Sequence, residues 1–279
     1  MVYNDHYPSK KAFRNSCLRE YARHFPAVGV DATFYRFPSQ QQMERLADLT
    51  PPHFRFGTKV TEEITVYKYP THPRYGERRG KINPNFLRAD LFREQFHENV
   101  GPLGEKLGPM IFQFGSLPRE IIDDGTFLGR LEDFLAELPQ GYRYATEIRN
   151  RQLFNDQYFD VLRRNGVAHV HTSWSWMPAL AEQLAMAQSM TAAFFVMRLL
   201  TPPHMAYGDA VESFFPYTRI QRPQLETRQA LQKELGRAIE KQFPGYVFIN
   251  NRLEGASPLT IEQVLDRILE DRQDLISSR

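Results

Sequence analysis

The sequence is poor in cysteine and has no long apolar run. Cys17 is the single cysteine among 279 residues, so no disulfide can form within the chain. A chain without disulfides is typical of a reducing compartment. No stretch of about 18 consecutive apolar residues occurs, and the first eight residues lack the basic and apolar regions of a signal peptide. We therefore expect a cytoplasmic protein that has no membrane partner.

A strong excess of either charge is also missing. The chain contains 35 basic and 33 acidic residues, a formal net charge of +2. This balance does not by itself predict nucleic-acid binding. A chain of this length can bury a large core, so no metal ion or disulfide is needed for its stability.

Seven short runs rich in β-branched and aromatic residues do occur, and a helical pattern follows each. The runs span residues 27–35, 54–60, 109–115, 143–149, 167–173, 193–200 and 246–251. Strands that alternate with helices predict parallel pairing, and no linker divides the chain. We expect one α/β domain over residues 1–279, a TIM-barrel-like (β/α)8 fold.

Seven strands are one fewer than that fold requires. The chain opens with a tyrosine-rich loop and a helix, so we expect the first strand to be missing upstream of Met1. The alternative is a genuine seven-stranded or open barrel.

Helix ends can also be predicted. Ser39 followed by Gln42 has the spacing of a capping box. Asn155 can cap a second helix, which Gly166 ends in the left-handed conformation. Thr260 followed by Gln263 is expected to open the last helix.

Alternation along each strand assigns the faces, because the side toward the helices must be apolar. In the first run this leaves Gly29, Asp31, Thr33 and Tyr35 inward. The inward polar residues of the other runs are Arg55, Lys59, Gln113, Glu147, Arg149, His169, His171 and Arg198, with either Asn250 or Asn251. Several of these lie at the carboxyl ends of their strands, where barrels of this type build active sites.

Two of the inward residues are candidate catalytic groups. Glu147 can act as a general acid or base, with Arg149 and Arg198 setting its pKa. The alternative is a buried Glu–Arg network that fixes the register of the barrel. Lys59 can form a Schiff base, or an ion pair with Asp31 or Glu147.

The remaining candidates are expected to bind substrate. They are Asp31, Tyr35, Gln113, Arg149, His171, Trp174, Arg198, Asn250 and Asn251. Two acids, Asp31 and Glu147, face three bases, Lys59, Arg149 and Arg198, which leaves one positive charge in excess. This excess favours a small polar or anionic ligand, such as a sugar or sugar phosphate.

Each of several features has a second interpretation. His169 and His171 could bind a metal ion with Asp31 and Glu147, but no HExxH-like spacing supports this, and core histidines are commoner. Asn250 and Asn251 suit hydroxyl recognition or the attachment of the next loop. Trp174 and Trp176 suit a rim that stacks on a ligand, or core packing. The sequence identifies no cofactor, no metal site and no oligomeric state.

The loop 74–81 combines four basic residues with one acidic residue, a net charge of +3, and two glycines. It could close over an anion, although charge runs are usually solvated surface.

Four segments resemble the domain-of-unknown-function-72 family, also called YecE-like. They are residues 33–38 (TFYRFP), 103–114 (LGEKLGPMIFQF), 147–149 (EIR) and 248–260 (FINNRLEGASPLT). The resemblance implies a TIM-barrel-like fold and no particular reaction. Members begin with a strand and a Gly-Trp turn, whose end Tyr7-Pro8 matches, so the resemblance also implies a missing first strand.

The chain departs from the family pattern at three places. Gly29 and Asp31 stand where the family often has Glu and Asn. Val66 replaces a common His, and Leu200-Thr201 replaces His-Gly. A mechanism that depends on those groups would not apply to this chain.

Two hypotheses follow. In the first, the protein is an enzyme that acts on a small polar or anionic metabolite by acid–base chemistry at Glu147. In the second, it is a non-catalytic barrel that binds nucleic acid or a protein through the basic loop and the two tryptophans. We prefer the enzyme, because the positive groups converge on the mouth of the barrel.

Overall fold

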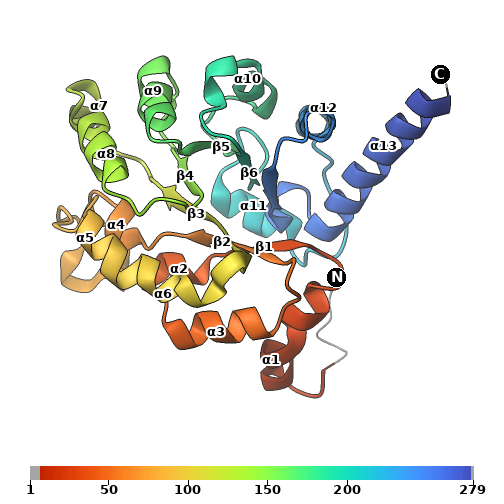
Figure 1. Cartoon of the computed structure of the whole chain (residues 1–279), viewed down its shortest axis with the longest axis horizontal. Coiled ribbons are helices and arrows are strands. Elements are labelled where there is room, and N and C mark those ends of the chain that lie inside the picture. Colours follow the sequence, from red (N-terminus) through yellow and green to blue (C-terminus); the bar gives the residue numbers. More distant parts are fainter. Residues whose placement is uncertain (1–6, 278–279) are drawn as a thin grey trace. The chain divides into compact units, whose positions relative to one another are not determined.

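Strands and helices alternate along residues 7–277, which the computed structural model describes (Figure 1). The chain divides into two compact units between residues 168 and 169. The described residues contain seven strands, and the strands pair in parallel within each unit. The predicted α/β class with seven strands is therefore confirmed.

The first unit contains a four-stranded parallel sheet. Its strands are β1 (Ala27–Val30), β2 (Arg55–Lys59), β3 (Leu107–Gln113) and β4 (Tyr144–Glu147). Each strand pairs with the next one along the chain, so the spatial order follows the sequence order. Short strands joined by helical connections are typical of βαβ units.

Thirteen helical segments are described in the first unit. They are α1 (Lys10–Tyr21), α2 (Ala32–Tyr35), α3 (Gln40–Asp48), α4 (Glu62–Thr65), η2 (Pro73–Arg78), α5 (Ala89–Leu91), η3 (Phe92–His97), α6 (Glu98–Val100), η4 (Gly101–Lys106), α7 (Arg119–Asp123), α8 (Thr126–Ala136), η5 (Arg151–Leu153) and α9 (Asp156–Arg164).

Two predicted helix starts are confirmed in this unit. The Ser39 hydroxyl accepts from the Gln42 amide at 3.3 Å, and the Gln42 side chain accepts from the Ser39 amide at 3.4 Å. Asn155 Oδ1 accepts from the Tyr158 amide at 3.1 Å. Gly166, with a φ of 64°, takes the left-handed conformation after α9. A side chain at that position would be strained, so glycine is favoured there.

Aromatic side chains fill the space between the sheet and the helices of the first unit. The Phe112 ring of β3 lies 5.2 Å from Phe92 and 5.1 Å from Phe134, measured between centroids. All three side chains are buried. The face of β3 that bears Phe112 is therefore the helix side, which leaves the opposite face for polar groups.

The second unit contains three parallel strands. They are β5 (Ala168–Ser173), β6 (Phe195–Leu199) and β7 (Gly245–Ile249). Its helical segments are α10 (Leu180–Ala185), η6 (Ala187–Ser189), α11 (Tyr207–Phe214), α12 (Leu225–Glu240), η7 (Asn251–Leu253) and α13 (Ser257–Ser277). Met197 and Leu199 of β6 form a buried core with Leu231 of α12 and Val264 of α13.

The predicted start of the last helix is wrong by three residues. Helix α13 begins at Ser257, whose amide donates to Asn251 Oδ1 at 2.8 Å. Thr260 lies inside this helix and therefore does not cap it, and its hydroxyl donates to buried Glu254 at 2.7 Å. Among the helices of residues 7–277, none combines the length and the apolar composition that crossing a bilayer requires.

Candidate functional site

Polar side chains of the first unit gather on one face of its sheet, at the carboxyl ends of the strands. The strand register pairs Lys59 with Ile111 and Gln113 with Glu147. Paired residues share a face, and so do residues two apart on one strand. Lys59, Gln113 and Glu147 therefore lie on the face opposite Phe112, as predicted. With Arg149 they form the strand-end cluster.

Glu147 is held by a neighbouring guanidinium. Its Oε1 accepts from Nε of Arg149 at 3.2 Å and from Nη2 at 2.9 Å. The same Nη2 lies 3.1 Å from Oε1 of Gln113. The Glu147 side chain is 0% exposed and that of Arg149 is 15% exposed. A carboxylate buried this deeply requires a charged or hydrogen-bonded partner, and Arg149 supplies both.

The charge of Glu147 also acts on Tyr158, which is fully buried in α9. Burial raises the pKa of the Tyr158 hydroxyl well above its ordinary value, and the Glu147 carboxylate raises it further. The hydroxyl stays protonated and donates to the carbonyl of Thr146 at 3.2 Å. Tyr158 therefore braces the end of β4 next to the carboxylate.

Lys59 is the second charged group of this face. Its Nζ lies 3.5 Å from Asp31, and the side chains are 10% and 60% exposed, respectively. The same Nζ lies 4.1 Å from the centroid of the Phe34 ring. An ion pair with so exposed a carboxylate contributes little stability, so an anionic ligand could displace Asp31 at low cost.

The predicted strand over residues 27–35 is wrong beyond Val30. The Asp31 backbone is already helical, and a helical turn, α2, follows it. The Thr33 hydroxyl stabilises this turn by donating to the carbonyls of Val30 at 2.8 Å and Lys59 at 2.7 Å. Thr33 and Tyr35 are therefore not inward strand residues.

Tyr35 instead lies on the surface. Its side chain is 60% exposed, and its ring centroid is 4.9 Å from the guanidinium of Arg74. It therefore lies beside the basic loop of residues 74–81, which begins at Arg74.

Four of the five charged groups in the predicted balance lie in the first unit, and these four balance. Asp31 and Glu147 are offset by Lys59 and Arg149. The predicted excess of one positive charge depends on Arg198, which lies in the second unit. The convergence of Arg198 with Glu147 therefore stays a prediction.

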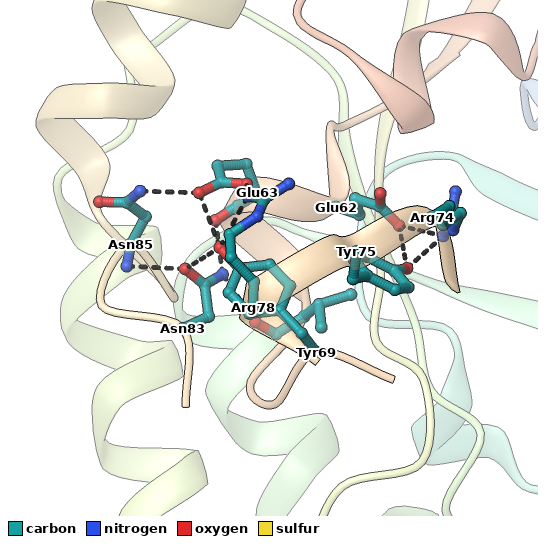
Figure 2. Close-up of polar contacts among 9 residues, drawn as sticks. Glu62, Glu63, Tyr69, Arg74, Tyr75, Arg78, Asn83 and Asn85 are labelled. Atoms are coloured by element: carbon teal, nitrogen blue, oxygen red, sulfur yellow. Dashed lines mark hydrogen bonds and ion pairs between the residues drawn. The ribbon is translucent and has the colours of Figure 1, made fainter. Parts of the chain in front are cut away.

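The basic loop of residues 74–81 is attached to α4 by two consecutive glutamates, Glu62 and Glu63 (Figure 2). The sequence analysis did not identify these two residues. Glu62 Oε2 accepts from Arg74 Nη2 at 2.6 Å and from the Tyr75 hydroxyl at 2.8 Å. Both Glu62 and Tyr75 are buried. The signal in the sequence was a pair of acids directly after a strand, followed by arginines and tyrosines.

Glu63 holds the other half of the loop, as Figure 2 shows. It accepts from the Tyr69 hydroxyl at 2.7 Å, from Arg78 at 2.9 Å and from Asn85 at 2.8 Å. These hydrogen bonds lower the pKa of Glu63 against the opposing effect of burial. Burial and Glu63 in turn raise the pKa of Tyr69 to about 12.

These pairs change the interpretation of the basic loop. Arg74 and Arg78 are two of its four cations, and each forms an ion pair with a glutamate of α4. The loop is therefore an anchored structure with less free positive charge than its composition indicates. It gives little support to a nucleic-acid surface.

In the second unit, Arg198 lies on the face that was predicted for it. It pairs with Thr172 of β5 and Phe248 of β7, whereas Met197 and Leu199 belong to the helix-side core. The Arg198 side chain is buried.

The predicted inward orientation of His169 and His171 is wrong. His171 pairs with Met197 and therefore faces the helix side. Its Nε2 lies 2.8 Å from the Ser189 hydroxyl, and burial lowers its pKa to about 4. His169 lies on the same face, two residues away. The error arose because Val170 was assumed to face the helices, whereas Val170 pairs with Val196 on the Arg198 face.

The two asparagines after β7 attach the loop that follows. Asn250 Oδ1 accepts from the Arg252 amide at 2.9 Å, and Asn251 Oδ1 accepts from the Ser257 amide and hydroxyl, both at 2.8 Å. Of the two interpretations considered for them, loop attachment is the one that these contacts show.

The two tryptophans differ in exposure. Trp174 is half-buried, with its ring centroid 6.3 Å from that of Tyr207, while Trp176 is 67% exposed. A role of Trp174 in ligand stacking stays a prediction. Across residues 7–277 no three histidine, cysteine or acidic side chains are grouped as a metal site would need.

Known proteins were compared with the chain. A family model described as "Protein of unknown function DUF72" matches residues 2–278. UPF0759 protein YunF of Bacillus subtilis (strain 168) is 27% identical over 163 residues, 57% of this chain and 52% of that protein. UPF0759 protein YecE of Escherichia coli (strain K12) is 28% identical over 139 residues, 49% of this chain and 43% of that protein. The chain thus matches about half the length of these relatives.

Solved structures show the same fold. A DUF72 family protein of Enterococcus faecalis V583 superposes with a TM-score of 0.61 at 18% identity, covering 91% of this chain and 95% of that one. One from Thermotoga maritima MSB8 has a TM-score of 0.61 at 18% identity, with 95% and 93% covered. The predicted TIM-barrel-like α/β fold class is thereby confirmed.

Proposed function

The chain belongs to the DUF72 family of proteins of unknown function. From the chemistry of the strand-end cluster we propose that it is an enzyme acting on a small polar or anionic metabolite. The ligand binds at the carboxyl ends of β2, β3 and β4, against the strand-end cluster. Sugars and sugar phosphates have the matching chemistry, since they combine hydroxyl groups with negative charge.

The arrangement of Glu147 and Lys59 supports this proposal more than any other observation. The two charged side chains come from different strands, share one face, and lie at the strand ends where such folds place their chemistry. Neither is needed to fill the apolar core, which lies on the other face. Two buried charged groups on one face are costly to maintain for structure alone.

We assign a separate role to each group. Lys59 attracts the negative charge of the ligand. The ligand then takes the place of Asp31 as the ion-pair partner of Lys59. Glu147, which Arg149 holds in a fixed orientation, transfers a proton to or from a hydroxyl or carbonyl group of the substrate. Gln113 lies beside Arg149 and offers amide hydrogen bonds to substrate oxygens.

A substrate screen tests the proposal. The wild-type protein is incubated with a library of sugars, sugar phosphates and small carboxylates, and turnover is followed by NMR. Glu147→Gln keeps the shape of the side chain and removes its acid–base capacity, so turnover should fall by roughly 10²–10⁴-fold. Arg119→Gln, an exposed site on α7, is the matched control. Undiminished turnover in Glu147→Gln would remove this residue from the mechanism.

A binding measurement separates the enzyme from a simple binding protein. If Glu147→Gln still binds the same compound within a few-fold of wild type, the lost turnover reflects chemistry. A ligand that the wild type binds without converting it would contradict the catalytic part of the proposal.

A further inference from the structure

A pocket lies in the first unit, away from the strand-end cluster. It encloses about 400 Å³ between α1, α3 and residues 30–38. Val30 of β1 lines it, and Val30 pairs with Thr58, on the face opposite that of Lys59. The pocket is thus on the helix side of β1. Pockets of about 300–1,000 Å³ are of the size that holds small ligands.

The inner lining of this pocket is mainly apolar. Helix α1 contributes Leu18, α3 contributes Met43, Leu46 and Leu49, and the chain between α2 and α3 contributes Phe37. Such a surface favours a ligand with a hydrocarbon or aromatic body.

Three arginines also line the pocket, namely Arg14 of α1, Arg36 after α2, and Arg45 of α3. Arg45 donates a hydrogen bond to the neutral side chain of Asn15, so its charge is not offset by that contact. No aspartate or glutamate lines the pocket. Among the ion pairs formed by the side chains that the structure describes, none involves these three arginines. Three uncompensated guanidinium groups beside an apolar cavity complement a ligand that carries one negative group on an apolar body.

We propose that this pocket binds a small amphipathic anion, a medium-chain carboxylate, with its chain among the leucines and its carboxylate at the arginines. The site is independent of the proposed function at Glu147. A neutral lipid would leave the arginines unused, and a small inorganic anion would leave the apolar surface uncovered.

The single cysteine supplies a direct measurement. Cys17 lines the pocket and is partly exposed, and the chain has no other cysteine to react. The rate at which N-ethylmaleimide modifies Cys17 is followed by intact mass, with decanoate, decanol or acetate added. Decanoate should slow the reaction at least fivefold, whereas acetate and decanol at equal concentration should slow it less than twofold. No protection by decanoate, or equal protection by decanol, would overturn the proposal.

Calorimetric titration with octanoate and decanoate tests the same site without the thiol. Each added methylene should tighten binding by roughly threefold to fourfold. The double variant Arg36→Gln/Arg45→Gln should weaken decanoate binding at least tenfold, while Arg119→Gln leaves it unchanged. Both altered arginines are exposed, so the variant is expected to fold, which circular dichroism verifies. Unchanged affinity in the double variant would place the ligand elsewhere and overturn the assignment.

Discussion

Both hydrogen bonds from Arg149 to Glu147 reach the same carboxylate oxygen, Oε1, at 3.2 Å and 2.9 Å. The guanidinium also contacts Gln113, so Arg149 links the carboxylate of β4 to the amide of β3. This relationship makes the stability of the fold sensitive to how the pair is altered.

Removing only the cation should be costly. Arg149→Met leaves the Glu147 carboxylate buried beside an apolar side chain, and we expect the free energy of unfolding to fall by about 3 kcal/mol. The double variant Glu147→Gln/Arg149→Met removes both charges and should recover most of that loss. Urea unfolding of both variants and of Glu147→Gln completes the double-mutant cycle. Additive losses would show that the two residues do not interact.

The loop after β2 should depend on Glu62. Glu62→Gln weakens the contacts to Arg74 and Tyr75, so we expect faster hydrogen exchange at the Tyr75 amide, which bonds to the His72 carbonyl at 3.1 Å. The free energy of global unfolding is expected to fall by about 1 kcal/mol. Glu132→Gln, which removes an exposed ion pair with Arg164, is the control. Unchanged exchange in Glu62→Gln would mean that other contacts hold the loop.

Acid should destabilise the second unit through His171. Its folded pKa is lowered to about 4, so the native state binds fewer protons than the unfolded state between that value and the ordinary 6.5. Stability therefore falls as the pH drops from about 6.5 to 4, by roughly 3 kcal/mol for this histidine. The ring centroid of His169 lies 5.0 Å from that of His171. Burial also lowers the pKa of His169, so this residue adds to the loss of stability in acid.

Unfolding of His171→Asn as a function of pH tests this prediction. The variant should lose a large part of the pH dependence over that interval, whereas His24→Asn, at an exposed position, should keep it. An equal pH dependence in both variants would assign the effect to other groups.

Periodicity and capping predicted most of the fold. All seven strands lie inside or within two residues of the predicted runs, because apolar alternation and helix caps are local signals. The turn after Val30 was missed because its cause is not local to the run. The Thr33 hydroxyl bonds to Lys59 on the next strand, which favours α2 over a longer strand.

The site was predictable only where the apolar alternation was unambiguous. All residues of β3, β4 and β5 are buried, so only the residue types could assign the faces. Gln113 lies between two phenylalanines that favour the helix side, whereas His171 lies between Val170 and Thr172. In such a strand polarity does not reveal which face meets the helices, and the register with β6 decides it. Glu62 was missed because it lies beyond the strand end, where alternation no longer applies.

The exposed partner of Lys59 provides the last test of the proposed site. Asp31 competes with any anionic ligand for the lysine, and its 60% exposure limits the strength of that competition to under about 1 kcal/mol. Asp31→Asn should therefore tighten the binding of glucose 6-phosphate up to about fivefold. Lys59→Met should weaken it more than tenfold, because in the proposed binding mode the phosphate contacts the buried amine. Calorimetric titrations at two salt concentrations measure both effects, and the affinity of Asp31→Asn should fall more steeply with salt than that of Lys59→Met. If Asp31→Asn weakens binding as much as Lys59→Met does, the aspartate contacts the sugar hydroxyl groups itself, which contradicts its proposed displacement by the phosphate.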